Sequence, residues 1–178
     1  MNVMKFVLGV FTATTLISCG GDKKKPIYVD TENVVEEAGY SSYAQSGDEI
    51  VVPFRNENGV KYVQVKVNGV GFEMVFDTGC SGSLISVAEA NYLYQKGKLT
   101  QEDIIGTTQS QIADGSVVEN MVVNLKEVVI SDQILCPNVR ATVSNNINAP
   151  LLLGNEILDR VATIKIDNEQ EALIFKLK

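Results

Sequence analysis

Residues 75–81 read Val75-Phe76-Asp77-Thr78-Gly79-Cys80-Ser81, a run of β-forming residues that ends in a carboxylate and a tight turn. The two apolar residues before the aspartate predict the end of a strand that is buried on both faces. A carboxylate there is costly unless it is hydrogen-bonded or has a chemical role, and Gly79 lets the backbone turn sharply beside a ligand. We therefore interpret Asp77 as a catalytic carboxylate. The alternative is an ordinary turn that closes a hairpin.

The residue types that the chain lacks exclude several kinds of chemistry. Its 178 residues contain no histidine, which removes Ser-His-Asp and Cys-His nucleophiles and histidine-ligated zinc. The three cysteines, at positions 19, 80 and 136, show no C-x-x-C spacing, so no metal site is expected. No P-loop or dinucleotide-binding motif is present, so no cofactor is expected. A net charge of −7 argues against a nucleic-acid partner. Carboxylates remain as the catalytic groups.

Residues 1–18 predict a signal peptide. Lys5 precedes an apolar run at residues 6–17 that is too short to cross a membrane comfortably. The run ends in Leu16-Ile17-Ser18-Cys19-Gly20, which resembles the lipobox of bacterial lipoproteins. This resemblance implies a diacylglyceryl group on Cys19, with a lipid bilayer as partner and the periplasmic or surface face of a bacterial envelope membrane as location. A plain secretory signal with a chance cysteine is the alternative.

The rest of the chain divides into two parts by composition. Residues 19–49 are polar and acidic after the lipidated N-terminus, and predict a tether. Three lysines at its start, Lys23, Lys24 and Lys25, would lie beside the bilayer, where each adds on the order of 1 kcal/mol of attraction to anionic lipid. Residues 50–178 predict one folded domain, because a hydrophobic content of 45% is sufficient for a core.

A predicted hairpin leads to Asp77. Asn68-Gly69 is a strong two-residue turn signal, and residues 70–76 form the return strand that delivers the aspartate. Apolar and polar residues alternate in the outgoing strand, so one face is predicted to be buried: Val63, Val65 and Val67.

The other predicted elements are short. Ser86 and Glu89 form a capping box that predicts a helix ending at Gly97, and a similar pattern predicts a second helix at residues 101–105. A helix is also predicted at residues 156–160. Strands are predicted at residues 50–54, 107–112, 117–118, 121–130, 134–143, 151–153, 161–166 and 172–177. Together these elements predict a mostly β domain with two or three short helices.

Three motifs follow one another in a familiar order: Asp77-Thr78-Gly79, a polar hairpin tipped by Asp114-Gly115, and Leu152-Leu153-Gly154 before a short helix. Over residues 60–178 this order resembles the retropepsin-like aspartic proteases, the single-domain relatives of pepsin. The resemblance implies a closed β-barrel that forms half of an acid protease, and the activity of an aspartic endopeptidase on peptide or protein substrates. Because the chain has one Asp-Thr-Gly, it also implies a homodimer.

The resemblance assigns a role to each motif. Asp77 would pair with Asp77 of the partner subunit and activate a water, and Thr78, Gly79, Cys80 and Ser81 would support the catalytic loop. The hairpin with Asp114 and Gly115 would be a flap that closes over the substrate. Leu152, Leu153 and Gly154 would pack behind the catalytic loop.

Some positions depart from the family pattern. Cys80 stands where relatives carry Ser or Ala, and Ser81 and Asn155 stand where retroviral members pair an Asp with an Arg, so one dimer contact is missing. These departures leave open a binding module that holds extended peptides in the same cleft without cutting them. A disulfide between Cys80 and Cys136 also stays open.

Overall fold

The hairpin before Asp77 forms as predicted in the computed structural model, which describes residues 26–29, 49–111 and 115–178. β4 (Val60–Val67) and β5 (Val70–Phe76) pair antiparallel. Asn68 and Gly69 have φ angles of 48° and 82°, as a tight hairpin turn requires. The valines predicted to share a face are all buried: Val63, Val65 and Val67.

The end of β5 differs from the prediction. Val75 and Phe76 are half-buried, so the expectation of a strand buried on both faces is wrong at this point. The reason is tertiary, because Phe76 lines an open hollow beside the loop at residues 77–82, the candidate catalytic loop.

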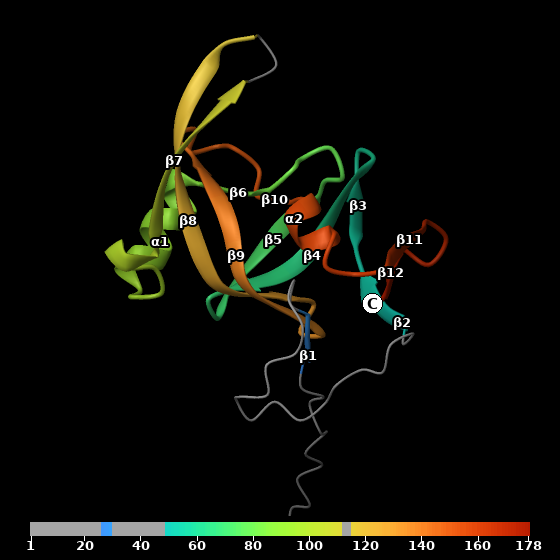
Figure 1. Ribbon diagram of the computed structural model, residues 1–178. Helices are drawn as coiled ribbons and strands as arrows, with labels where there is room; N and C mark the ends of the chain where they lie inside the picture. The colour runs from blue at the N-terminus through green and yellow to red at the C-terminus, as the bar shows by residue number, and fades with distance from the viewer. Residues whose placement is uncertain (1–25, 30–48, 112–114) are drawn as a thin grey trace, which may run out of the picture.

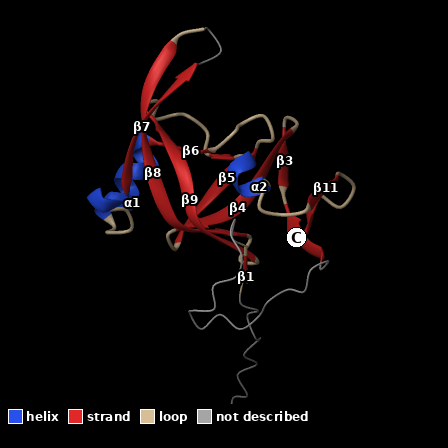
Figure 2. Ribbon diagram, viewed as in Figure 1, coloured by secondary structure: helices blue, strands red, loops and turns tan. Residues whose placement is uncertain are grey.

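Six strands close into a barrel, which confirms the predicted fold class (Figures 1 and 2). Going around the ring, they are β4, β5, β10 (Leu152–Leu153), β6 (Ser83–Ser86), β9 (Ile134–Ser144) and β8 (Val117–Ile130), which pairs again with β4. Alternate side chains point inward, as expected for a small barrel, and form its core. Examples are Val65, Leu125, Val139 and Leu153.

β7 (Ile104–Gln111) pairs with the first half of β8, and this hairpin projects beyond the barrel at the top of Figure 1. The sequence predicted two separate strands at residues 117–118 and 121–130, which is wrong. β8 is continuous because it changes partners without a gap: Met121 pairs with Thr107 on one side and with Val143 on the other.

The helices are short. α1 (Val87–Gln95) begins at the predicted capping box, in which Ser86 accepts a bond from the Ala88 N–H and Glu89 reaches back to the Ser86 N–H. The predicted helix at residues 101–105 is only the 3₁₀ turn η1 (Gln101–Asp103), because the chain enters β7 at once. α2 (Asn155–Leu158) follows β10.

A second sheet packs against the same core. Its order is β11 (Thr163–Asp167), β12 (Ala172–Lys176) and β2 (Glu49–Pro53). Pro53 thus lies on an edge strand, where proline is tolerated. The short strand β3 (Arg55–Glu57) pairs antiparallel with the start of β4, with Arg55 opposite Tyr62.

The segment assigned to the tether also contributes a strand. β1 (Ile27–Tyr28) pairs in parallel with β9, with Ile27 opposite Ile134. The Val29 N–H donates to the Leu135 carbonyl over 2.7 Å, and Val29 is buried.

Candidate active site

A neighbouring strand fixes the backbone of Asp77. β10 runs parallel to β5, with Leu153 opposite Phe76. The Asp77 N–H consequently donates to the Leu153 carbonyl over 3.1 Å, and the Val75 N–H donates to the Leu151 carbonyl over 2.8 Å. The apolar segment at residues 151–153 therefore holds the end of β5, which carries Asp77.

The turn after Asp77 orients its side chain. The Gly79 N–H donates to Asp77 Oδ1 over 2.8 Å, and the Cys80 N–H donates to the Asp77 carbonyl over 3.4 Å. A Cβ on Gly79 would lie 3.2 Å from Asp77 Oδ1, so glycine keeps this close approach free. The carboxylate is half-buried, which leaves it accessible to a ligand.

Gly154 allows the catalytic loop to cross the start of α2. A Cβ at this position would lie 2.7 Å from the Gly82 carbonyl carbon and 2.8 Å from the Cys80 carbonyl oxygen, and well inside contact distance of the Gly82 carbonyl oxygen. The two N–H groups that follow donate to loop carbonyls: Asn155 to Cys80 over 2.9 Å and Glu156 to Ser81 over 3.1 Å. The loop and α2 thus form one unit.

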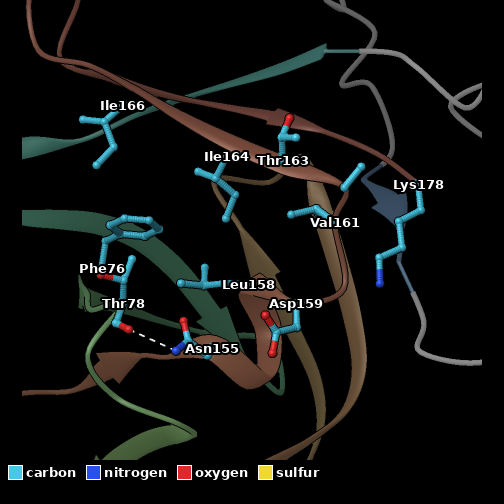
Figure 3. Close-up of a pocket in the computed structure, with 11 residues that line it drawn as sticks. Phe76, Thr78, Asn155, Leu158, Asp159, Val161, Thr163, Ile164, Ile166 and Lys178 are labelled. Atoms are coloured by element: carbon cyan, nitrogen blue, oxygen red, sulfur yellow. Dashed lines mark hydrogen bonds between the residues drawn. The ribbon is translucent and has the colours of Figure 1, made fainter.

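Asn155 makes a further contact that the sequence did not predict. Its Nδ2 donates to the Thr78 carbonyl over 3.0 Å (Figure 3). The sequence marked Asn155 only as a departure from the ion pair of retroviral relatives. In this chain the Asn155 amide binds the catalytic loop without a charged partner. The position of Asn155 directly after Gly154 was the signal available in the sequence.

Arg160, which follows α2, is buried and was not among the predicted site residues; its i,i+4 spacing from Glu156 was the available signal. Arg160 is 3% exposed. Its guanidinium donates to the carbonyls of Pro137 and Asn138 over 2.6 and 3.4 Å, and to Glu156 over 2.7 Å. These bonds connect α2 to β9 and so support the catalytic loop.

An open hollow of about 420 Å³ lies beside the loop (Figure 3). Phe76, Thr78 and Asn155 line one side of it, and Ile164 and Ile166 of β11 line the other. Ile166 is 43% exposed. The hollow therefore presents apolar side chains to solvent beside Thr78, the residue that follows Asp77.

A buried carboxylate, that of Asp103, lies at the base of the projecting hairpin. Asp103 is buried and accepts bonds from the Thr100 N–H and hydroxyl, each 2.8 Å long, and its Oδ1 lies 3.3 Å from Lys126 Nζ. Burial raises the pKa of Asp103, but the Thr100 bonds and the lysine outweigh it, so the pKa lies below its ordinary value of 3.8. This carboxylate thus stays ionised where β7 begins.

The remaining predicted site residues are placed as follows. Gly115 lies at the end of the projecting hairpin with a φ of 86°, whereas Asp114 and Cys19 lie outside the described residues. Cys80 and Ser81 lie in the catalytic loop, and no disulfide joins Cys80 to Cys136. In the described part of the chain, no three His, Cys, Asp or Glu side chains gather in a way that could hold a metal ion.

Comparison with known proteins agrees with this geometry. Residues 63–160 match the family described as "gag-polyprotein putative aspartyl protease". A crystal structure of a retropepsin-like aspartic protease from Rickettsia conorii is similar, with 26% sequence identity and a TM-score of 0.55; the match covers 73% of this chain and 91% of that one. No curated protein sequence matches the chain.

Proposed function

The chain belongs to the retropepsin-like aspartic proteases and is an aspartic-type endopeptidase, and we propose that it works as a lipid-anchored homodimer. The observation that carries the mechanism is the position of Asp77. Its carboxylate is accessible, its backbone is held by β10, and its Oδ1 accepts the Gly79 N–H. Each chain has one such carboxylate, so a pair requires a second copy.

In this dimer, Asp77 would face Asp77 of the partner subunit. Two carboxylates a few ångströms apart cannot both ionise, so they share one proton, as is established for aspartic proteases as a class. The ionised carboxylate takes a proton from a water, whose oxygen attacks the scissile carbonyl carbon. The protonated carboxyl donates to the carbonyl oxygen, and collapse of the tetrahedral intermediate releases the amine after it receives a proton. No covalent enzyme intermediate forms.

The apolar hollow supports the dimer. The hollow lies against Thr78, the residue next to Asp77. A second copy that approaches Asp77 would therefore also cover exposed apolar side chains, which is favourable. A twofold axis beside Thr78 would make the contact isologous, with the same surface on both subunits.

The projecting β7–β8 hairpin supports the role of a flap. The outer residues of its β7 strand are polar in sequence, and the hairpin extends past the end of the barrel (Figure 1). A peptide bound between this hairpin and Asp77 would lie as an added strand, held by backbone hydrogen bonds and by side-chain pockets. Closure of the hairpin would exclude water from the dyad.

The lipid on Cys19 would hold the enzyme on the periplasmic or surface face of a bacterial envelope membrane. The support for this proposal is the lipobox-like sequence that ends at Cys19. None of the helices among the described residues is long and apolar enough to span a bilayer.

The test is hydrolysis of a peptide library by the chain without residues 1–19, beside the Asp77→Asn variant. Asparagine keeps the shape but cannot ionise, so hydrolysis should fall by several orders of magnitude while peptide binding persists. Undiminished hydrolysis by Asp77→Asn would place the catalytic centre elsewhere. Binding without cleavage by the wild type would instead support the peptide-binding module.

Sedimentation of the same protein tests the dimer. We expect self-association, at least with a peptide-like inhibitor bound, because one carboxylate cannot form the shared-proton pair. A strict monomer that still cleaves peptides would refute the dyad.

A further inference from the structure

The docked strand β1 determines where the N-terminal segment joins the domain. β1 pairs with the first residues of β9, where Ile27 lies opposite Ile134. Val29 is buried, and Ile27 packs against the core. The chain that arrives from Cys19 therefore meets the domain at Ile27, well before β2.

The point of attachment is at the opposite end of the molecule from the flap. β8 and β9 pair along their length, from Ile130 opposite Ile134 at one end to Met121 opposite Val143 near the other. Beyond Met121, β8 continues into the flap and reaches Val117. In Figure 1, β1 lies at the lower end and the flap at the upper end. At about 3.3 Å per residue, the 14 residues of β8 place the two ends up to about 43 Å apart.

The catalytic loop also lies away from β1. β6, which leaves this loop, begins with Ser83 opposite Ala141. Ala141 is seven residues beyond Ile134 along β9, so Ser83, where the loop ends, lies about 23 Å along the sheet from the β1 end. Both the loop and the flap are therefore displaced from β1 in the same direction.

The connection to the proposed lipid is short. Eight residue steps separate Cys19 from Ile27, and a fully extended chain covers about 3.5 Å per step, or about 28 Å in total. Without β1, the first anchored strand would be β2 at Glu49, and the connection would have thirty steps. The basic residues Lys23, Lys24 and Lys25 lie within the short connection, where an anionic lipid surface would attract them.

We propose that β1 orients the enzyme on the bilayer, with the β1 end toward the lipid and the flap end toward the aqueous compartment. This inference rests on the lipid anchor of the proposed function. The orientation selects a substrate class: extended segments of soluble polypeptides, or of chains that stand away from the membrane. Peptide bonds at the lipid surface lie out of reach of the cleft.

Energy transfer to the bilayer tests the orientation. The chain contains no tryptophan, so one introduced tryptophan is a unique donor, and vesicles of anionic lipid with dansyl-labelled headgroups supply the acceptor. Two exposed valines on strands form a matched pair of probe sites: Val51→Trp near the β1 end and Val117→Trp on the flap. Gln133, next to β1, donates to the Val51 carbonyl over 2.8 Å, and the two valines are 50% and 62% exposed.

We expect the full-length lipidated protein to float with the vesicles and to show severalfold stronger transfer from position 51 than from position 117. Val29→Asp should undock β1, lengthen the connection and reduce this difference, whereas the exposed control Ile147→Asp should preserve it. A twenty-residue Gly-Ser insertion between Lys25 and Pro26 should have the same effect as Val29→Asp without altering the fold.

Equal transfer from both positions would overturn the proposal, as would a difference that survives the Gly-Ser insertion. A protein that does not float would remove the anchor on which the inference rests. None of these results depends on hydrolysis, so they are separate from the test of Asp77.

Vesicle-tethered peptides test the substrate class. The peptide cleaved best in the library would be attached to a lipid either directly or through a twenty-residue spacer. Vesicle-bound enzyme should cleave the spaced peptide at least tenfold faster, whereas the soluble enzyme without residues 1–19 should show a smaller preference. Equal preference in the two enzymes would refute the orientation.

Discussion

Gly154→Ala should displace the loop that carries Asp77 and so lower activity, although residue 154 contacts no reacting group. Gly154 has a φ of −99°, which alanine adopts readily, so backbone strain is not the reason. The reason is a steric clash between the added methyl group and the loop. An added Cβ would lie 2.7 Å from the Gly82 carbonyl carbon and 2.8 Å from the Cys80 carbonyl oxygen.

The size of the effect follows from these distances. Carbon atoms in contact prefer separations of about 3.5–4.0 Å, so the catalytic loop would have to retreat by on the order of 1 Å. Overpacking of this kind costs about 1–3 kcal/mol of folding free energy. The loop carries Asp77, and a displacement of about 1 Å in a catalytic group costs on the order of 100-fold in rate.

The assay combines urea unfolding with peptide hydrolysis, and Gly82→Ala is the matched control. Gly82 belongs to the same loop, but a Cβ there meets no atom within 4 Å, so its folding free energy should change by less than about 0.5 kcal/mol. If Gly154→Ala is as stable and as active as Gly82→Ala, the close crossing of loop and helix does not support the site.

Three further predictions concern side chains around the loop. Arg160→Met should lower the free energy of unfolding by about 3 kcal/mol, because it leaves Glu156 and two carbonyls without their buried partner; a loss below about 1 kcal/mol in urea unfolding would contradict this. Asn155→Ala removes one hydrogen bond to Thr78, worth about 1 kcal/mol, so hydrolysis should fall about fivefold, and an unchanged kcat/KM would count against a positioning role. Because the pKa of Asp103 is lowered on folding, its stabilisation is present above pH 3.8 and is lost as pH falls through the folded-state pKa. The stability difference between wild type and Asp103→Asn should therefore shrink in acid, and a difference independent of pH would show that the charge contributes nothing.

The parts of the fold that depend on neighbouring residues were predictable. The Asn68-Gly69 hairpin, the capping box at Ser86 and the barrel class all agree with the sequence prediction. The hairpin and the capping box rest on local chemistry: a turn that needs positive φ angles, and a side chain that satisfies a helix N-terminus. The barrel class instead came from the resemblance to the retropepsin-like family. The errors occurred where long-range pairing prevails over local preference, as when β8 exchanges β7 for β9 as its partner without a break.

The candidate site likewise has a part that was predictable from the sequence and a part that was not. Asp77, Thr78 and Gly79 are recognisable because a carboxylate followed by a tight turn is a local pattern. The bonds that Asn155 and Arg160 make to distant carbonyls were not predicted, because Thr78 lies 77 residues from Asn155, and Pro137 and Asn138 lie 23 and 22 residues from Arg160.

By itself, the sequence determined the chemistry that this protein can perform: it has no histidine, one Asp-Thr-Gly, and a mostly β chain around it. The tertiary structure alone decided how the aspartate is held, since β10 reaches Asp77 only after the barrel closes. It also decided that β1 docks at the end of the barrel opposite the flap. The physical reason is that a strand's own residues specify its conformation and its apolar face, whereas its neighbour is selected by the packing of the whole sheet.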